Sequence, residues 1–407
     1  MAPHSTDFVR AGQPDPRDAP TREWIEAMRT RYPCERYVDK ALVRKLEIRT
    51  SPPYRPLTLA EAEKQLRAFL SATVEGAFEL SDLRPLGGGA SKEQFAFWLE
   101  WQDGGVARHE RLVLRMQPAQ AVVETHRLRE FQILEAVGRE IPVPKPYWLD
   151  TEPRFFQQPA LIYSFVSGVA RPPEGDVRYS ARGGLGPKWR AILAPQFIQW
   201  SARIATFDYS GCDLSAFDIA AEGTNEAVLQ VLNMWERAWD EDRLEAVPLV
   251  SLAAQWLRDN APPVDRVSIV HGDYRVGNFL FDPQDGHFTA IMDWELVHFG
   301  DRHEDLATIL LPALGERDEN GDFLVNGLCS REEYLARYEA ASGLPVDPKR
   351  LRYYEIYNYF RTTCMNLGSS ARCMATQKSN QDIVQVFGTA VASVMLANLE
   401  TALSAEL

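Results

Sequence analysis

Residues 268–281 read SIVHGDYRVGNFLF, and residues 290–295 read AIMDWE. The first stretch opens with a short apolar run that predicts a strand ending near Asp273, and the second opens with another that ends at Asp293. Asn278 lies five residues after Asp273, and Asp293 lies fifteen residues after Asn278. The spacing indicates that two strands and their loops deliver these polar side chains as one group.

These residue types suit the transfer of a phosphoryl group. Such catalysis needs positioning, metal neutralisation of phosphate charge and an acceptor aligned in line. Asp273 would hold an acceptor hydroxyl and accept its proton, and Asn278 and Asp293 supply hard oxygen ligands for a Mg²⁺ that bridges nucleotide phosphates. The alternative is a pair of turns in which Asp and Asn cap the local backbone. The elements upstream of these residues favour the first interpretation.

A glycine-rich loop is the first of these upstream elements. Residues 86–91 read LGGGAS and lie within a β-hairpin that the alternating pattern predicts over 78–114. Backbone N–H groups of such a loop can cover phosphates, although glycine clusters are also ordinary turns. We expect the phosphate contacts to come from Gly87, Gly88, Gly89 and Ser91.

The HGDxxxxN…D arrangement resembles the catalytic and metal-binding loops of the aminoglycoside phosphotransferase and choline kinase superfamily, whose members are relatives of protein kinases. The resemblance covers roughly residues 83–399. It implies an α+β, bilobal, protein-kinase-like fold, with a small N-terminal antiparallel-sheet lobe and a larger, mainly helical C-terminal lobe. It also implies that ATP and Mg²⁺ are the cofactors.

The resemblance assigns further residues to the nucleotide. Arg115 ends a predicted strand where the family has a lysine or arginine that touches the α- and β-phosphates, and Glu130 matches the carboxylate that orients this cation. Lysine is the commoner choice, but the forked guanidinium also binds phosphate. A surface salt bridge between the two is the alternative. Tyr163 and Phe165 fall in the interlobe connector, whose backbone binds adenine in the family, so the preference for ATP over GTP rests on the family alone.

Other polar residues flank the presumed base. His271 would orient the catalytic loop, with simple packing as its alternative, and Arg275 would face the acceptor or the γ-phosphate, with a solvated arginine equally possible. Residues 300–307, GDRHEDLA, resemble the GDPxxDLA run of the family, with Arg302 in place of proline. We expect Asp305 to brace the catalytic loop and Asp301 to be a turn residue.

The pattern of the chain predicts four parts. They are a disordered leader (1–20), an N-terminal helical extension (21–77), a nucleotide-binding N-lobe (78–167) and a helical C-lobe with the catalytic loop, metal site and acceptor pocket (168–407). Predicted helices cover residues 21–31, 58–72, 121–137, 189–207, 226–241 and 249–260, begin near 305 and 330, and run from 348 to the end.

Composition excludes several classes of function. The 44 Lys and Arg residues against 57 Asp and Glu give a net charge of −13, which argues against nucleic-acid coating and against polybasic membrane binding. Five cysteines without a CxxC pair, and no signal sequence at the start, favour a reduced, cytoplasmic protein. The apolar run 387–399 is too short to span a bilayer and predicts a buried helix.

The acceptor is expected to be a hydroxyl group of a small molecule, and three hypotheses compete. HGDYRVGN with DWE resembles the phosphotransferases associated with acyl-CoA dehydrogenases, which points to a hydroxyacyl-CoA or a similar metabolite. An aminoglycoside or macrolide kinase is the second hypothesis, and an inactive nucleotide-binding pseudokinase is the third. The protein is expected to be a monomer or homodimer. One helix face carries aromatic side chains that would be either core or pocket, at Tyr353, Tyr357 and Phe360, with Cys364 beside them.

Overall fold

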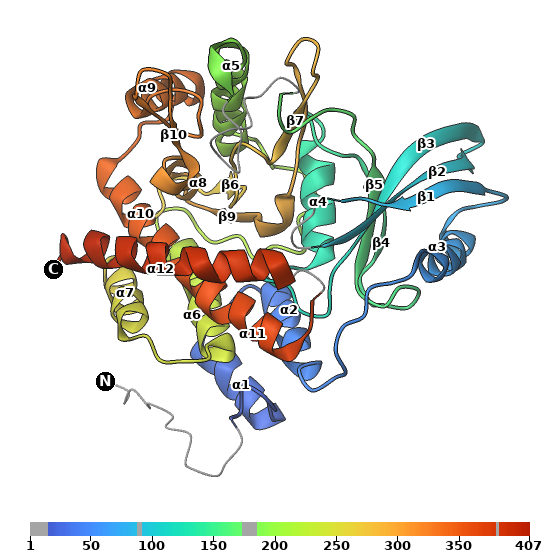
Figure 1. Cartoon of the computed structure of the whole chain (residues 1–407), viewed down its shortest axis with the longest axis horizontal. Coiled ribbons are helices and arrows are strands. Elements are labelled where there is room, and N and C mark those ends of the chain that lie inside the picture. Colours follow the sequence, from blue (N-terminus) through green and yellow to red (C-terminus); the bar gives the residue numbers. More distant parts are fainter. Residues whose placement is uncertain (1–14, 88–91, 173–184, 380–381) are drawn as a thin grey trace.

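The computed structural model describes residues 15–87, 92–172, 185–379 and 382–407, and it has two lobes (Figure 1). The smaller lobe is built on a five-stranded antiparallel sheet in the order β1-β2-β3-β5-β4. The predicted α+β, bilobal architecture is therefore confirmed. The strands are β1 (Glu79–Pro85), β2 (Glu93–Asp103), β3 (Val106–Met116), β4 (Pro146–Asp150) and β5 (Ala160–Ser164).

Strand β3 shows how the two faces of this sheet are covered. Leu112 and Leu114 pack into a core with α3 (Leu59–Thr73), whereas Val113, between them, packs into the larger core with α4 (Arg127–Val137). The sheet thus lies between α3 and α4 in Figure 1. Helix α3 begins with the predicted capping box, in which Thr58 accepts from Glu61 N and the Glu61 carboxylate accepts from Thr58 N. Because side chains alternate along a strand, Arg115 points to the α4 side, as Val113 does.

The larger lobe is mainly helical, and two short strand pairs deliver its polar loops. β6 (Ser268–Val270) pairs with β9 (His298–Gly300), and β7 (Phe279–Phe281) pairs with β8 (Phe288–Ile291). A further short pair, β10 (Glu316–Arg317) with β11 (Phe323–Leu324), lies at the surface. The helices of this lobe are α5 (Gly186–Ala205), α6 (Glu226–Asp242), α7 (Pro248–Asp259), α8 (His303–Ile309), α9 (Arg331–Ser342), α10 (Pro348–Thr363), α11 (Ala371–Thr376) and α12 (Asp382–Ser404).

Two predicted helices have different bounds in the structure. The helix expected over 121–137 begins at Arg127, because the Glu124 carboxylate folds back to accept from Ala121 N and Gln117 Nε2 and so holds a loop. The helix expected from 348 to the end is interrupted. A π-helical stretch, Cys364–Ser370, follows α10, and Gln377 ends α11 in the left-handed conformation with φ of 54°.

Most apolar positions of the last helices belong to the core. Tyr353, Tyr357, Phe360 and Cys364 are buried, so the aromatic face of α10 is core and not a pocket. Helix α12 is only half-buried, because Leu399 is enclosed while Val386 and Val394 are exposed, so the buried helix predicted there has one exposed face. Among the residues that the structure describes, no helix is long and apolar enough to cross a membrane.

The N-terminal extension is divided between the lobes: α3 packs on the sheet, and the part before α3 packs along the base of the helical lobe (Figure 1). It contains the expected α1 (Arg22–Arg31) and also α2 (Arg36–Glu47), which the sequence did not suggest. Most of the predicted leader lies outside the described residues, but Arg17 is buried and donates from Nε to Asp240 O at 2.7 Å. Part of the predicted leader therefore contacts α6 through Arg17.

Candidate active site

The catalytic loop leaves β6 through a turn that requires glycine. Gly272 has φ of +81°, and a Cβ there would lie 2.8 Å from Leu296 Cβ and 2.9 Å from Leu296 O. The Asp305 carboxylate accepts from His271 N at 2.7 Å and from Gly272 N at 2.9 Å, while Arg361 donates to Gly272 O at 2.9 Å. The expected bracing geometry of Asp305 is thus present, and burial raises its pKa although His271 and the two donors oppose that effect.

His271 is buried and faces inward. Its Nδ1 accepts from Asp273 N at 3.3 Å, so Nε2 carries the proton and donates to Met292 O at 2.9 Å. The ring therefore ties the catalytic loop to the residue just before Asp293. This geometry suits the orienting role expected for His271 and leaves no nitrogen of the ring for proton transfer.

Asp273 lies at the open side of this loop between two side chains. Arg275 Nε donates to its Oδ1 at 2.9 Å, and Asn278 Nδ2 donates to its Oδ2 at 2.6 Å and to its backbone oxygen at 2.9 Å. The Asp273 side chain is 30% exposed, so an acceptor can reach it. Asp273 and Asn278, predicted from the HGDxxxxN spacing, therefore form one contact group with Arg275.

Asn278 and Asp293 are held as neighbours by the β7–β8 pair. Phe279 is opposite Ile291, and Met292 N donates to Asn278 O at 2.8 Å. Asp293 has φ of 66° and ψ of 52°, a left-handed conformation that non-glycine residues adopt rarely and often at functional sites. Because Asn278 uses its Nδ2 on Asp273, its Oδ1 remains as the oxygen for a cation. One carboxylate and one amide oxygen suit Mg²⁺, whose remaining ligands are usually phosphate oxygens and water.

The predicted pair of Arg115 and Glu130 is formed and buried. Arg115 Nη1 donates to Glu130 at 2.9 Å, and its Nη2 donates to Asp293 at 2.7 Å and to Glu295 at 3.0 Å. Both the arginine and Glu130 are less than one-tenth exposed, so the surface salt bridge is ruled out as an interpretation. Desolvation and the neighbouring carboxylate of Glu295 raise the pKa of Asp293, although Arg115 acts in the opposite sense.

Two further cations complete this cluster, and sequence reasoning missed both. Lys92, at the start of β2, is buried with its Nζ 3.1 Å from Glu295 Oε2. Arg127 contacts Glu130 and lies 3.9 Å from Glu295. Burial lowers the pKa of Lys92 despite the charge of Glu295. The signal for Lys92 was its place directly after the glycine loop and one position ahead of a strand that pairs with β3, where Gln94 faces Arg115.

The other residues that were predicted to bind the nucleotide lie in the following places. The side chain of Tyr163 is buried in the core, and burial raises its pKa to about 12 although Arg115 acts in the opposite sense. Phe165 N donates to Arg111 O at 2.8 Å, and the Arg111 guanidinium lies 3.8 Å from the Phe165 ring. Gly87 is exposed at the end of β1. Three residues of the expected phosphate loop, Gly88, Gly89 and Ser91, lie outside the described residues.

Both the fold and a family comparison place the chain among known proteins. A crystal structure from Ralstonia eutropha JMP134, which its description assigns provisionally to the aminoglycoside phosphotransferases, has a TM-score of 0.61, is 23% identical, and covers 84% of this chain and 98% of its own. The fold is that of the two-lobed, kinase-like phosphotransferases. A sequence model of the family described as the phosphotransferase enzyme family matches residues 82–354, and the chain belongs to this family. The resemblance found in the motifs is thereby confirmed.

Curated relatives extend the comparison. Acyl-CoA dehydrogenase family member 10 of Mus musculus is 26% identical over 283 residues, which are 66% of this chain and 25% of the relative. The protein of Arabidopsis thaliana called probable acyl-CoA dehydrogenase IBR3 is 26% identical over 281 residues, which are 65% of this chain and 33% of the relative. The chain therefore spans a quarter to a third of the length of these relatives.

Proposed function

We propose that this protein transfers the γ-phosphoryl group of ATP to a hydroxyl group of a small organic molecule. The observation that carries the proposal is the arrangement around Asp273: its half-open carboxylate lies next to Asn278, which is the neighbour of Asp293, which in turn contacts Arg115. One series of contacts thus joins the proposed proton acceptor Asp273, two candidate metal ligands and a cation that would bind phosphate.

The chain's own residues divide the work as follows. Asp273 accepts the proton of the acceptor hydroxyl while the oxygen bonds to the γ-phosphorus and the bond from that phosphorus to the departing ADP oxygen breaks. Asn278 and Asp293 would hold Mg²⁺, which supplies neutralisation of phosphate charge when it is bound. Arg115, oriented by Glu130, contacts the α- and β-phosphates, and Lys92 holds Glu295 beside it. Arg275 donates to Asp273 and would face the acceptor or the γ-phosphate.

The proposed acceptor class is a hydroxyacyl-CoA or a similar hydroxylated metabolite. Support comes from the two curated relatives whose names include acyl-CoA dehydrogenase. The antibiotic alternative would need free carboxylates to bind a cationic drug. Four carboxylates of α6 instead contact the chain's own side chains: Glu236 pairs with Arg258, Asp240 with Tyr32 and Arg31, Glu241 with Arg237 and Lys45, and Asp242 with Lys45 and Arg49.

A screen of acceptors tests the proposal. The experiment couples ADP release to a dye over hydroxyacyl-CoAs, aminoglycosides, macrolides and simple alcohols, with ATP or GTP and Mg²⁺. Acceptor-dependent ADP release with a hydroxyacyl-CoA supports the assignment. Release with only the antibiotics selects the second hypothesis, and nucleotide binding without release for any acceptor selects the pseudokinase.

A further inference from the structure

We propose that Glu35 is a positioning residue, whose buried ion pair with Arg129 holds α4 and thereby keeps Glu130 and Arg115 in the arrangement that binds nucleotide phosphates. Arg129 Nη1 donates to Glu35 Oε2 at 2.6 Å, and Nη2 donates to Oε1 at 3.0 Å. Both side chains are less than one-tenth exposed. A two-pronged, desolvated pair of this kind fixes orientation as well as distance.

Arg129 also reaches the segment that carries Asp293. Its Nη2 donates to Val297 O at 3.1 Å, and its guanidinium lies 4.2 Å from the ring of Phe217. Asp218 N donates to Glu35 Oε2, which also accepts from Arg129 Nη1, at 3.0 Å. One pair of side chains therefore connects the N-terminal extension, α4, the loop at 216–218 and the segment that follows the metal-binding aspartate.

Helix α4 explains how Glu35 would affect residues that it does not contact. Arg127 and Glu130 extend from α4 toward Arg115, whereas Arg129 extends from the same helix toward the extension. Because the three side chains share one rigid helix, a rotation or shift of α4 moves all of them together. Glu35 does not contact Arg115, so its effect on the nucleotide must pass through α4.

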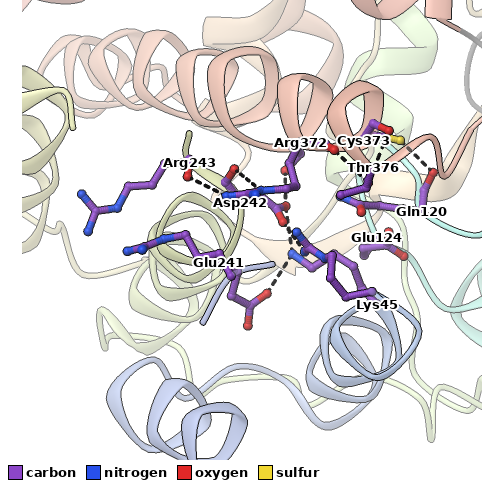
Figure 2. A network of polar contacts seen from close by, with 12 residues as sticks. Lys45, Gln120, Glu124, Glu241, Asp242, Arg243, Arg372, Cys373 and Thr376 are labelled. Atoms are coloured by element: carbon purple, nitrogen blue, oxygen red, sulfur yellow. Dashed lines mark hydrogen bonds and ion pairs between the residues drawn. The ribbon is translucent and has the colours of Figure 1, made fainter. Parts of the chain in front are cut away.

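The extension is itself anchored, so it can resist such a movement. Figure 2 shows Lys45 of α2 directed toward Glu241 and Asp242 at the end of α6, with Arg372 of α11 on the opposite side. Lys45 Nζ lies 2.8 Å from Glu241 and 2.9 Å from Asp242, and Arg49 lies 2.6 Å from Asp242. All of these groups are fully buried. Helix α2 therefore connects the end of α6 in the helical lobe with α4, the helix that carries Glu130.

The effect of Glu35 on nucleotide binding rests on the proposed function, but its effect on α4 does not. The experiment therefore measures both, by hydrogen exchange and by nucleotide affinity. Hydrogen exchange compares wild-type protein with Glu35→Gln and with Glu26→Gln, since Glu26 is an exposed carboxylate of α1 that accepts from Arg29. Glu35→Gln is expected to speed amide exchange in α4 and in residues 293–300 by about tenfold, and Glu26→Gln is expected to change neither. Unchanged exchange in folded Glu35→Gln would overturn the positioning role.

The second readout is the affinity for Mg·AMP-PNP, measured by calorimetry in a double-mutant cycle with Arg115→Ala. Glu35→Gln should weaken binding by about tenfold in the wild-type background and by much less when Arg115 is already alanine. Equal weakening in both backgrounds would mean a general loss of structure and would overturn the proposal. If the wild-type protein binds no nucleotide, the proposed function fails, which is distinct from unchanged exchange in α4.

A second variant protects the test if Glu35→Gln does not fold. Arg129→Lys keeps the charge but loses the forked contact with Glu35 and the contact with Val297 O. It is expected to speed exchange in the same two segments, and the absence of any change in them would contradict the proposal equally.

Discussion

Lys92 and Arg115 together decide the charge at the nucleotide end of the candidate site. Arg115 contacts three carboxylates, and Lys92 shares one of them, Glu295. Burial acts to raise the pKa of Glu295, but Lys92, Arg115 and Arg127 outweigh it and lower the pKa. Phosphate oxygens would compete with Asp293 and Glu295 for Arg115, so the strength with which Lys92 holds Glu295 affects how readily Arg115 can bind phosphate.

We predict that Lys92→Met weakens binding of Mg·ATP by about tenfold, because Glu295 then draws more strongly on Arg115. Calorimetry of nucleotide binding measures the effect. Lys64→Met is the matched control, since Lys64 is an exposed lysine on α3. An affinity that is unchanged in Lys92→Met would show that Lys92 does not control how Arg115 binds phosphate.

A second prediction concerns the turn at Gly272. Alanine there would combine a positive φ with a clash against Leu296, so Gly272→Ala is expected to cost about 1–3 kcal/mol of unfolding free energy and to disturb Asp273. Gly211→Ala is the control, because Gly211 also has a positive φ, of +74°, but its Cβ would meet no atom within 4 Å. Chemical denaturation of both variants separates the clash from the backbone strain, and equal losses would contradict the account of the turn.

At the scale of elements, α2 shows what the sequence could not predict. The pattern of Ala41, Leu42 and Leu46 fits a helix, but the residue before the helix is Glu35, whose carboxylate binds Arg129 and leaves the helix without a side-chain cap. The start signal was missing because a tertiary contact uses the side chain. Helix α4 begins later than predicted for a similar reason, because the Glu124 carboxylate folds back on its own loop.

Two of the strands around the catalytic loop, β6 and β8, could be predicted from the sequence, whereas β7 and β9 were not predicted. The apolar runs of β6 and β8 end at polar residues with a fixed spacing, and the contact of Asn278 with Asp273 follows from local chain geometry. Asp305, in contrast, reaches His271 N from 34 residues away along the chain. The pair of Arg115 and Glu130 could be predicted through the resemblance. Lys92, Arg127 and Glu295 could not, because their importance depends on which charges the fold buries together.

The attachment of α2 leads to a prediction about acid. Burial acts to raise the pKa of Asp242, but Lys45 and Arg49 outweigh it and lower the pKa to about 2. A carboxyl whose pKa is lower in the folded state stabilises the fold above its unfolded pKa and loses that contribution as pH falls toward the folded value. We therefore expect unfolding free energy to fall by about 2 kcal/mol between pH 4 and pH 2 from this group.

Urea denaturation as a function of pH tests this expectation. Asp242→Asn should be less stable than wild type at pH 7 and should lose less stability across the acid range, because it has no charge there to lose. Glu26→Gln, on the exposed face of α1, should keep the slope of the wild type. A slope in Asp242→Asn that equals that of the wild type would show that other carboxyls carry the acid sensitivity.

At the scale of the whole molecule, the two lobes meet at the candidate site and are joined again by the N-terminal extension. Arg115 and Glu130 come from the small lobe, Asp293 and Glu295 from the large one, and α2 contacts both α6 and, through Glu35, α4. The net charge of −13 opposes an anionic nucleotide at long range, but three buried cations gather where its phosphates would lie. The proposed function therefore rests on this local arrangement of charges and not on the overall composition.

The central claim is that Asp273 is the proton acceptor in phosphoryl transfer. The most direct measurement follows the label from γ-labelled ATP, with Mg²⁺, into the hydroxyl acceptor that gives the highest ADP release, in wild type and in Asp273→Asn side by side. We predict labelled product from the wild type, and transfer lower by about 10²- to 10⁴-fold in Asp273→Asn while nucleotide affinity stays within a few fold. Transfer by Asp273→Asn at the wild-type rate would contradict the account.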